Sequence, residues 1–266
     1  MKTRVLSAIL IVALFIPFLI IGDIPFAIFM SILSAAGLYE LFRVRESKKP
    51  FPLLLKLIGY VIVVAFCLNN FSSIDFRYNF DYRVMAAIIF IFISPMVFIN
   101  DTKKFNLNDA LFLIGSVLFL GLSFNLIIIT RNYDISYIIY LLLVTTITDT
   151  FALFTGKLIG KNKLCPKISP NKTIEGFVGG VLMGTFVATA FYNTVISSSV
   201  SLVLVIFLTM ILCLVGQLGD LVFSSIKRYY DVKDFSNLIP GHGGILDRFD
   251  SLIFVTLAFI ILKGLL

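Results

Sequence analysis

Residues 202–224 read LVLVIFLTMILCLVGQLGDLVFS, an apolar run in which Asp220 is the one charged residue. A helix rises about 1.5 Å per residue, so about 20 apolar residues span the hydrocarbon core of a bilayer. Strands of membrane barrels alternate apolar and polar residues instead. This stretch therefore predicts a transmembrane helix, and similar runs along the chain extend the prediction to the whole fold.

The composition has the same character over the full length. Hydrophobic residues make up 59% of the 266 residues and charged residues 14%, whereas soluble domains carry about 25% charged residues. Lipid offers no partner to backbone N–H and C=O groups, which favours helices. We predict an all-α, polytopic integral membrane bundle of about nine transmembrane helices, near residues 5–22, 24–42, 53–69, 84–100, 109–130, 137–156, 176–196, 202–224 and 250–266.

Lysine and arginine are distributed unevenly among the predicted loops. The amino terminus and every second loop after it hold 18 of the 22 basic residues. Basic loops face the cytoplasm, so we predict a protein of the cytoplasmic membrane with its amino terminus inside and its carboxyl terminus outside. This bias by itself accounts for the net charge of +7. The charge is therefore no independent sign of a partner, and we expect no nucleic acid.

Four carboxylates fall near the cytoplasmic ends of predicted spans. Asp149 lies about 10 Å inside the sixth span, Asp220 is near the end of the eighth, and Asp247 and Asp250 open the ninth. Acids inside a membrane are costly and usually line a cavity or site. The alternative is a set of interfacial ion pairs with Lys157, Lys227 and Arg248. For the four acids together, the site is the better interpretation.

The spacing of these acids predicts a metal site. Asp247 and Asp250 are three residues apart and share a helix face, as do Gln217, Asp220 and Ser224 on the eighth span. Carboxylates from facing helices can hold one or two divalent cations, and their hard oxygen ligands point to magnesium. A zinc site is not expected, because the chain has one histidine and three scattered cysteines. Asp220 and Asp247 are the predicted metal ligands.

The loop 157–175 is rich in lysine and predicts a phosphate site. Ser169 followed by Pro170 is typical of an N-cap with proline in the first helical position. Asn171, Lys172 and Thr173 would then lie in the first helical turn, where free N–H groups suit a phosphate. An ordinary capped helix start explains the same residues. The loop contains Lys157, Lys161, Lys163, Lys167 and Lys172.

Glycines at 241, 243 and 244 bracket the only histidine, His242. Glycine permits positive φ angles and close backbone approach, which suits a turn that cradles an anion. His242 is either a loop residue or a catalytic one. Small residues also recur every fourth position from Gly176 to Ala188, a spacing that lets helices approach closely, within the bundle or between two copies.

Two stretches resemble the phosphatidate cytidylyltransferases, also called CDP-diacylglycerol synthases. The first contains Ser224, Ile226-Lys227-Arg228, Lys233-Asp234, Ser236, Ile239-Pro240, His242-Gly243-Gly244, Asp247-Arg248 and Asp250. The second contains Asp149-Thr150, Gly156-Lys157, Gly160-Lys161, Lys163-Leu164, Pro166, Ile168-Ser169-Pro170, Lys172-Thr173 and Glu175-Gly176. The first 135 residues resemble the family only in length and hydropathy.

The resemblance implies that CTP and phosphatidate react to CDP-diacylglycerol and pyrophosphate, with magnesium, in a membrane cavity open to the cytoplasm. It also implies a homodimer. Residues 1–135 would be a scaffold giving lipid access, and residues 136–266 a catalytic region with cytoplasmic loops 157–175 and 225–249. The expected catalytic residues are Asp149, Asp220, Lys227, His242, Asp247 and Asp250. The expected substrate-binding residues are Ser169, Asn171, Lys172, Thr173, Glu175, Ser224, Arg228, Lys233, Asp234, Gly243, Gly244 and Arg248.

We expect the lipid phosphate to attack the α-phosphorus of CTP in line. Positioning and charge stabilisation would carry the rate. Two other functions fit parts of the sequence. A CTP-dependent polyprenol kinase would use a similar groove, and a secondary transporter would explain intramembrane acids. The transporter also predicts internal repeats, which the chain lacks. A CDP-alcohol phosphotransferase would need a DGxxAR-type run, which is absent.

Overall fold

A computed structural model describes residues 13–69, 82–99, 101–241 and 243–265. The chain divides into two compact units. The N-terminal unit comprises Met1–Asn132 and Asp234–Ile245, and the C-terminal unit comprises Tyr133–Lys233 and Leu246–Leu266. The polar run 224–250 is therefore divided between the two units, because residues 234–245 belong to the N-terminal unit and the rest to the C-terminal unit. His242 lies outside the described residues.

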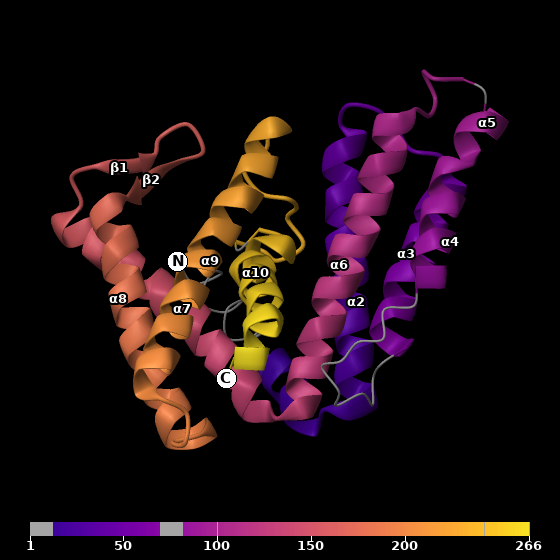
Figure 1. The fold of residues 1–266 in the computed structure, drawn as a ribbon. Helices are drawn as coiled ribbons and strands as arrows, with labels where there is room; N and C mark the ends of the chain where they lie inside the picture. Colours follow the sequence, from indigo (N-terminus) through magenta and orange to yellow (C-terminus); the bar gives the residue numbers. More distant parts are fainter. Residues whose placement is uncertain (1–12, 70–81, 100, 242, 266) are drawn as a thin grey trace. The chain divides into compact units, whose positions relative to one another are not determined.

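The N-terminal unit is built of helices. Residues 13–21 are helical, and Gly22 turns the chain in a left-handed conformation with a φ of 72°. A Cβ atom added at Gly59 would lie 3.7 Å from Leu38 and 3.4 Å from Val117, so the helix 53–69 contacts both the helix 23–46 and the helix 107–133. The described helices are α2 (Asp23–Glu46), α3 (Leu53–Asn69), α4 (Tyr82–Ile93), α5 (Pro95–Ile99) and α6 (Leu107–Tyr133) (Figure 1).

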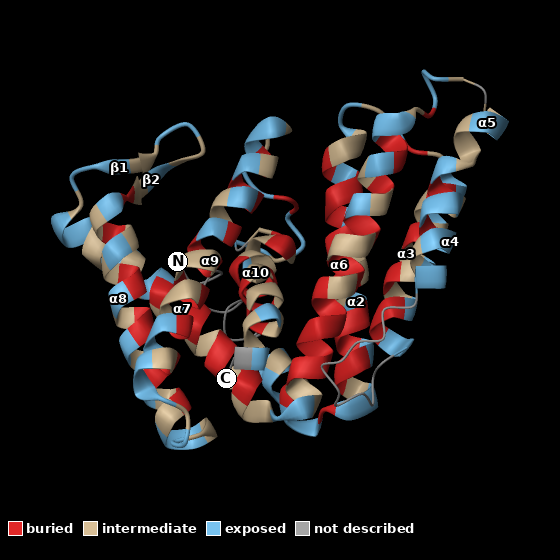
Figure 2. Cartoon of the chain, viewed as in Figure 1, coloured by how far each residue is buried: buried red, intermediate tan, exposed pale blue. Residues whose placement is uncertain are grey.

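The C-terminal unit contains four long helices and one hairpin. Its elements are α7 (Ile135–Ile159), β1 (Lys163–Cys165), β2 (Ser169–Thr173), α8 (Ile174–Phe191), a π-helical turn (Tyr192–Ile196), α9 (Leu202–Tyr229), α10 (Leu246–Leu262) and a 3-10 turn (Lys263–Leu265). α7 packs along α8, and α9 contacts α7, α8 and α10. Large apolar side chains such as Phe186 and Val203 remain exposed, and Figure 2 shows exposed stretches along the helices of this unit. In a bilayer, such side chains face lipid.

Helices α7 and α8 approach closely along the predicted stripe of small residues. A Cβ atom added at Gly180 would lie 2.6 Å from the carbonyl oxygen of Thr148, and one at Gly176 would lie 2.5 Å from that of Ala152. Backbone atoms cannot give way as a flexible side chain can. Packing inside the bundle is therefore the use of this stripe that the structure shows.

The apolar helices confirm an integral membrane protein with a helical bundle. Among the residues that the structure describes, six helices are long and apolar enough to cross a membrane, and α3 is a shorter apolar helix. The six are Asp23–Glu46, Tyr82–Ile99, Leu107–Tyr133, Ile135–Ile159, Ile174–Ile196 and Leu202–Tyr229. The predicted first span lies partly outside the described residues, and the count of nine spans stays a prediction.

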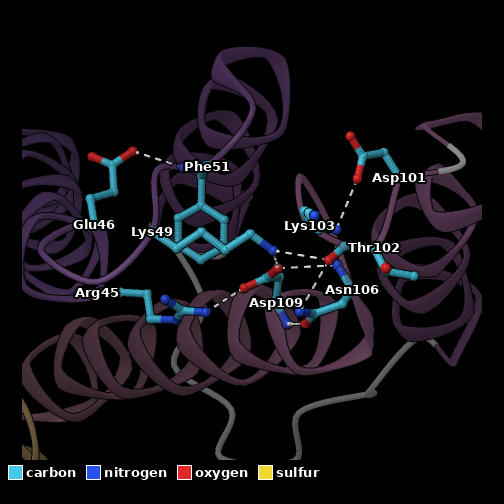
Figure 3. Close-up of polar contacts among 9 residues, drawn as sticks. All are labelled: Arg45, Glu46, Lys49, Phe51, Asp101, Thr102, Lys103, Asn106 and Asp109. Atoms are coloured by element: carbon cyan, nitrogen blue, oxygen red, sulfur yellow. Dashed lines mark hydrogen bonds and ion pairs between the residues drawn. The ribbon is translucent and has the colours of Figure 1, made fainter.

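A buried ion-pair network closes one end of the N-terminal unit (Figure 3). The carboxylate of Asp109, 1% exposed, pairs with the guanidinium of Arg45 and the ammonium of Lys49. It also accepts a hydrogen bond of 3.1 Å from the backbone N–H of Asn106. The acid thus fastens the segment after α2 to the start of α6, so the two basic loops of this unit meet at one end.

Candidate functional site

Helix α9 carries a polar stripe near its carboxyl end. Gln217 donates a hydrogen bond of 3.0 Å to the carbonyl of Phe177 and so ties α9 to α8. Further along α9, the hydroxyl of Ser224 donates a hydrogen bond of 3.3 Å to Oδ1 of Asp220. These residues recur at helical spacing, so the apolar helix presents a single polar face. The predicted stacking of 217, 220 and 224 is confirmed, with Gln217 in a packing role.

Asp220 pairs with a lysine from the hairpin. Nζ of Lys172 on β2 lies 2.6 Å from Oδ2 of Asp220, and the two side chains are 23% and 28% exposed. Nζ itself is buried and makes no hydrogen bond of regular geometry with the described residues. The contact is therefore an ion pair rather than a directed hydrogen bond. It brings the loop 157–175 onto the polar face of α9.

A second lysine–acid pair joins α9 to α10. Nζ of Lys227 donates a hydrogen bond of 2.7 Å to Oδ1 of Asp247, with side chains 11% and 6% exposed. Asp247 lies in the first turn of α10, where a carboxylate is favoured by the helix dipole. Deeper in the contact, a Cβ at Gly219 would lie 3.0 Å from the carbonyl oxygen of Asp250. Glycine therefore permits α9 and α10 to meet beside the acids.

The acids of three helices interact with one another. Asp250 of α10 interacts electrostatically with Asp220 of α9 and with Asp149 of α7. Asp149 also interacts with Asp220 and with Lys172. The predicted convergence of carboxylates is thus present within the C-terminal unit. With Asp247 included, four carboxylates face two lysines, which leaves an excess of negative charge when all are ionised.

This excess suits a hard cation. Oxygen donors without sulfur or imidazole are typical of magnesium sites, and a divalent ion would balance the surplus of acids over lysines. In the described part of the chain, no three His, Cys, Asp or Glu residues are already grouped as metal ligands. The carboxylate oxygens therefore fit magnesium in charge and chemistry. In the structure, Lys172 and Lys227 pair with the oxygens of Asp220 and Asp247.

The hairpin differs from the predicted helix start. Ser169 and Asn171 lie on β2, which pairs antiparallel with β1. Helix α8 instead begins at Ile174, with Thr173 as its N-cap accepting a 3.1 Å hydrogen bond from Gly176 N–H. The prediction of an N-cap at Ser169 was therefore wrong. In the hairpin, Ser169 is paired with Cys165 and Thr173 with Lys163, so the residues 169–173 form a strand and not a first helical turn.

Glu175, predicted to bind substrate, closes the base of the hairpin in the structure. Its carboxylate accepts backbone hydrogen bonds of 3.1 Å from Lys161 and Asn162 and a side-chain bond of 2.7 Å from Asn162. A carboxylate at the start of a helix also interacts favourably with the helix dipole. The contacts hold the residues before β1 against the start of α8, and this fixes the strand that carries Lys172.

Arg228, predicted to bind phosphate, links the hairpin to the end of α9. Its guanidinium donates to the carbonyl oxygens of Ile168 at 3.2 Å and Val232 at 3.1 Å. The two lysine-rich loops of the C-terminal unit therefore meet at one end. Three other residues predicted to bind substrate lie in the polar run 224–250 and are exposed, namely Lys233, Asp234 and Arg248.

The glycine turn belongs to the N-terminal unit and has the predicted backbone. Gly241 and Gly243 have φ angles of 78° and 82°, which glycine adopts without strain. The N–H of Ile239 donates to the carbonyl of Gly243 at 2.9 Å and closes the turn. Gly244 lies against the carboxylate of Glu40. The prediction of close backbone approach is confirmed for this turn.

Sequence reasoning missed Glu40. This acid belongs to the predicted span 24–42 and has an exposed fraction of 0% in α2. An acid within an apolar run marks a functional or structural site by default. That signal was present in the sequence and was applied only to the carboxyl-terminal half.

Comparisons with known proteins identify the family of this chain. A family model described as the cytidylyltransferase family matches residues 2–266. A phosphatidate cytidylyltransferase of Bacillus subtilis is 37% identical, over 96% of this chain and 94% of its own length. Proteins of the same name from Staphylococcus haemolyticus and Staphylococcus aureus are 38% and 39% identical, each over 96% of both chains. The chain belongs to the cytidylyltransferase family.

Proposed function

We propose that this enzyme is a phosphatidate cytidylyltransferase, which converts CTP and phosphatidate into CDP-diacylglycerol and pyrophosphate. The observation that carries the proposal is the convergence of Asp149, Asp220 and Asp250 beside Lys172 in the helical region of an integral membrane protein. A lipid substrate requires such a location, because its acyl chains stay in the bilayer while its phosphate meets polar groups. The names of the relatives support the same reaction.

Two lysines are the central phosphate ligands in this proposal. Lys172 and Lys227 contact acids in the structure, and an ammonium group binds phosphate oxygens equally well. Substrate phosphates would therefore compete with Asp220 and Asp247 for the same cations. Arg228, Lys233 and Arg248 are further phosphate ligands in this proposal, and Arg228 also holds the hairpin in place.

Magnesium completes the proposed site. Asp220 and Asp247 would hold the ion, with Asp149 and Asp250 beside them, and a second cation site fits the number of acids. When bound, the metal supplies positive charge that stabilises the attacking and leaving phosphate oxygens. This assignment is supported by the two lysine–acid pairs, Lys172 with Asp220 and Lys227 with Asp247, beside which Asp149 and Asp250 add two further carboxylates.

The chemical step needs little help from a base. A phosphate monoester is already anionic at neutral pH, since its second pKa is about 6. Its oxygen attacks the α-phosphorus of CTP, and the bond from that phosphorus to the β-phosphate oxygen breaks. Pyrophosphate leaves beside the lysines. The side chains of the site thus act by orienting two anions and by neutralising their charge.

The same proposal includes a cytoplasmic site and a homodimer. The contact of Arg228 with Ile168 supports the first point, because it brings lysine-rich loops to one end of the C-terminal unit. Basic loops of this kind face the cytoplasm. The homodimer follows from the family resemblance, and the mass of the protein in detergent would test it.

Product analysis with purified protein tests the function. The protein is incubated with phosphatidate, magnesium and CTP labelled in the cytidine ring, and the lipids and the soluble phosphates are then separated. Labelled lipid and released pyrophosphate are the expected products. A CTP-dependent kinase would instead release labelled CDP and leave the lipid unlabelled. That outcome, or the absence of both products, would contradict the proposal.

A further inference from the structure

The side chain of Thr173 lies where three elements of the C-terminal unit meet. Thr173 is the last residue of β2 and the N-cap of α8, and β2 also contacts α7. The side chain is buried, and its hydroxyl oxygen accepts a hydrogen bond of 3.1 Å from the N–H of Gly176. A residue that the sequence predicted to bind substrate therefore has its hydroxyl engaged inside the protein.

Glycines from α7 and α8 lie close around this hydroxyl. A Cβ atom added at Gly156 would lie 2.9 Å from Oγ1 of Thr173, and one added at Gly160, directly after α7, would lie 2.7 Å from it. The same distance for Gly176 of α8 is 2.9 Å. The absence of side chains at these three positions thus lets the two helices close around Thr173, which fixes the end of β2 against them.

The strand transmits this fixation to Lys172. Successive side chains of a strand point to opposite sides, so Lys172 points away from the glycines that enclose Thr173. Its Nζ atom lies 2.6 Å from Oδ2 of Asp220 on α9. On the other side of Thr173, the N–H of Ile174 donates a hydrogen bond of 2.9 Å to the carbonyl of Asn162. The backbone that carries Lys172 is therefore held from the side opposite to its ion pair.

Such support matters for a lysine more than for most residues. The ammonium group lies at the end of a flexible four-carbon stem, so it reaches a defined place only when the backbone beneath it is fixed. Displacement of a group in an active site by about 1 Å can cost about 100-fold in rate. A fixed backbone at Lys172 therefore has a direct consequence for a phosphate that the ammonium group receives.

We propose that Thr173 is a positioning residue, which holds the backbone of Lys172 so that its ammonium group receives a phosphate of the substrates beside Asp220. This inference rests on the proposed function, and it replaces the expectation that Thr173 binds substrate itself. Thr173 touches no substrate and acts through Lys172.

The first test measures the hold on residue 172 without a catalytic assay. Lys172→Cys is combined with Cys165→Ser, while Cys67 and Cys213 are buried, and the rate of reaction with a water-soluble maleimide is measured in detergent. The new thiol cannot form the ion pair, so that contact does not mask the effect of the cap. Thr173→Val keeps the shape of the side chain and removes the capping oxygen. It should raise the labelling rate about fivefold, the factor that loss of one N-cap is worth.

Asp134→Ala is the matched control for this measurement. Asp134 caps the opposite end of α7, where its carboxylate accepts a hydrogen bond of 2.7 Å from the N–H of Ser136. The control thus removes an N-cap of the same unit far from the hairpin, and it should leave the labelling rate at residue 172 within about twofold of the parent. Equal labelling rates with and without Thr173→Val would overturn the proposal.

The second test is a double-mutant cycle on kcat/KM for CTP. Thr173→Val should lower this value about tenfold, as a displacement of less than 1 Å implies. Thr173→Ser retains the capping hydroxyl and should stay within about threefold of the wild type. In a protein that carries Lys172→Met, Thr173→Val should have no further effect, because its action passes through the ammonium group that is then absent.

Two other roles of Thr173 predict different patterns. A purely structural role would lower the thermal midpoint, as Asp134→Ala does, and leave kcat/KM per folded molecule unchanged. A direct contact with substrate would give the same loss with and without Lys172 and no faster labelling. Either pattern would overturn the proposal.

If Thr173→Val does not fold, Gly156→Ala decides by the same measurements, since its Cβ atom displaces the hydroxyl of Thr173 from the side of α7. A wild-type protein without CTP–phosphatidate activity would sink the proposed function. The labelling rates would still decide whether Thr173 holds residue 172.

Discussion

Asp109 in the N-terminal unit and Asp220 in the C-terminal unit are both acids that pair with lysine, but their surroundings differ. Asp109 is 1% exposed and has two cations, Arg45 and Lys49. Asp220 is 28% exposed, has one lysine, and interacts with two further acids, Asp149 and Asp250. One region has more cations than acids around a closed contact. In the other, Asp220 has one lysine and two acidic neighbours and remains partly exposed.

This difference distinguishes an acid that stabilises the fold from acids that we propose to serve the reaction. A buried acid with an excess of cations has no need of another ligand, and removal of the acid leaves buried positive charges. A cluster of acids with too few cations is destabilised by repulsion until a cation binds. Such stored repulsion is typical of functional sites. The same substitution, Asp to Asn, should therefore act on activity in one region and on stability in the other.

The largest effect is expected for Asp247→Asn. It removes a proposed metal ligand and the partner of Lys227, and we expect kcat to fall about 1,000-fold, since electrostatic stabilisation of the reacting groups is lost. The protein should still be extracted folded in detergent. Initial rates with purified variant and wild type test this prediction. Activity within tenfold of the wild type would remove Asp247 from the site.

Lys172→Met should be the next most severe change. Methionine keeps most of the length of the side chain but removes the ammonium group that meets Asp220. We expect kcat/KM for CTP to fall about 100-fold, as for loss of one preorganised charge at a phosphate. Lys172→Arg should recover part of the loss. Equal activity of Lys172→Met and Lys172→Arg would show that the charge at this position is unimportant.

Asp109→Asn should act on stability instead. It leaves Arg45 and Lys49 without their shared carboxylate, and the partial exposure of both cations limits the cost to about 2 kcal/mol of unfolding free energy, below the 3–5 kcal/mol of fully buried pairs. The thermal midpoint in detergent should fall, while kcat per folded molecule stays within about threefold of the wild type. If the Asp109→Asn variant were as stable as the wild type but inactive, Asp109 would act on the reaction, and the proposed difference between the two regions would be wrong.

Asp250→Asn should have the smallest effect on stability and the opposite sign. It removes one of three mutually repelling acids, so the thermal midpoint should stay equal or rise by about 2 °C, as a gain of under 1 kcal/mol implies for a chain of this size. The measurement is made without magnesium, where repulsion is largest. A midpoint lowered as far as that of Asp109→Asn would show that Asp250 is a structural acid.

Much of the helical part could be predicted from the sequence. The apolar run 202–224 is helical throughout, within α9, because hydropathy and length decide which segments enter a bilayer. The run 84–100 is broken into α4 and α5 at Ser94, before Pro95, which lacks an N–H and disfavours a helical conformation in the residue before it. That break is local, and the proline was visible in the sequence.

The hairpin was mispredicted because two local signals compete. Ser169-Pro170 is typical of an N-cap, but so is Thr173 followed by Glu175 in the first turn. Pairing of β1 with β2 and the contacts of Glu175 with Asn162 favour the later start. These contacts join residues on either side of a turn, and a pattern read along the chain does not weigh them.

The sequence by itself determined the apolar helices, the carboxylates near their ends and the glycines of the turn, since each depends on residue type and spacing. Only the tertiary structure decided which lysine meets which acid, that Asp109 is satisfied while Asp220 has acidic neighbours, and that Glu40 holds the segment 236–245. These pairings join residues up to about 200 positions apart. They follow from the packing of helices, because burial forces every charge to find a partner in three dimensions.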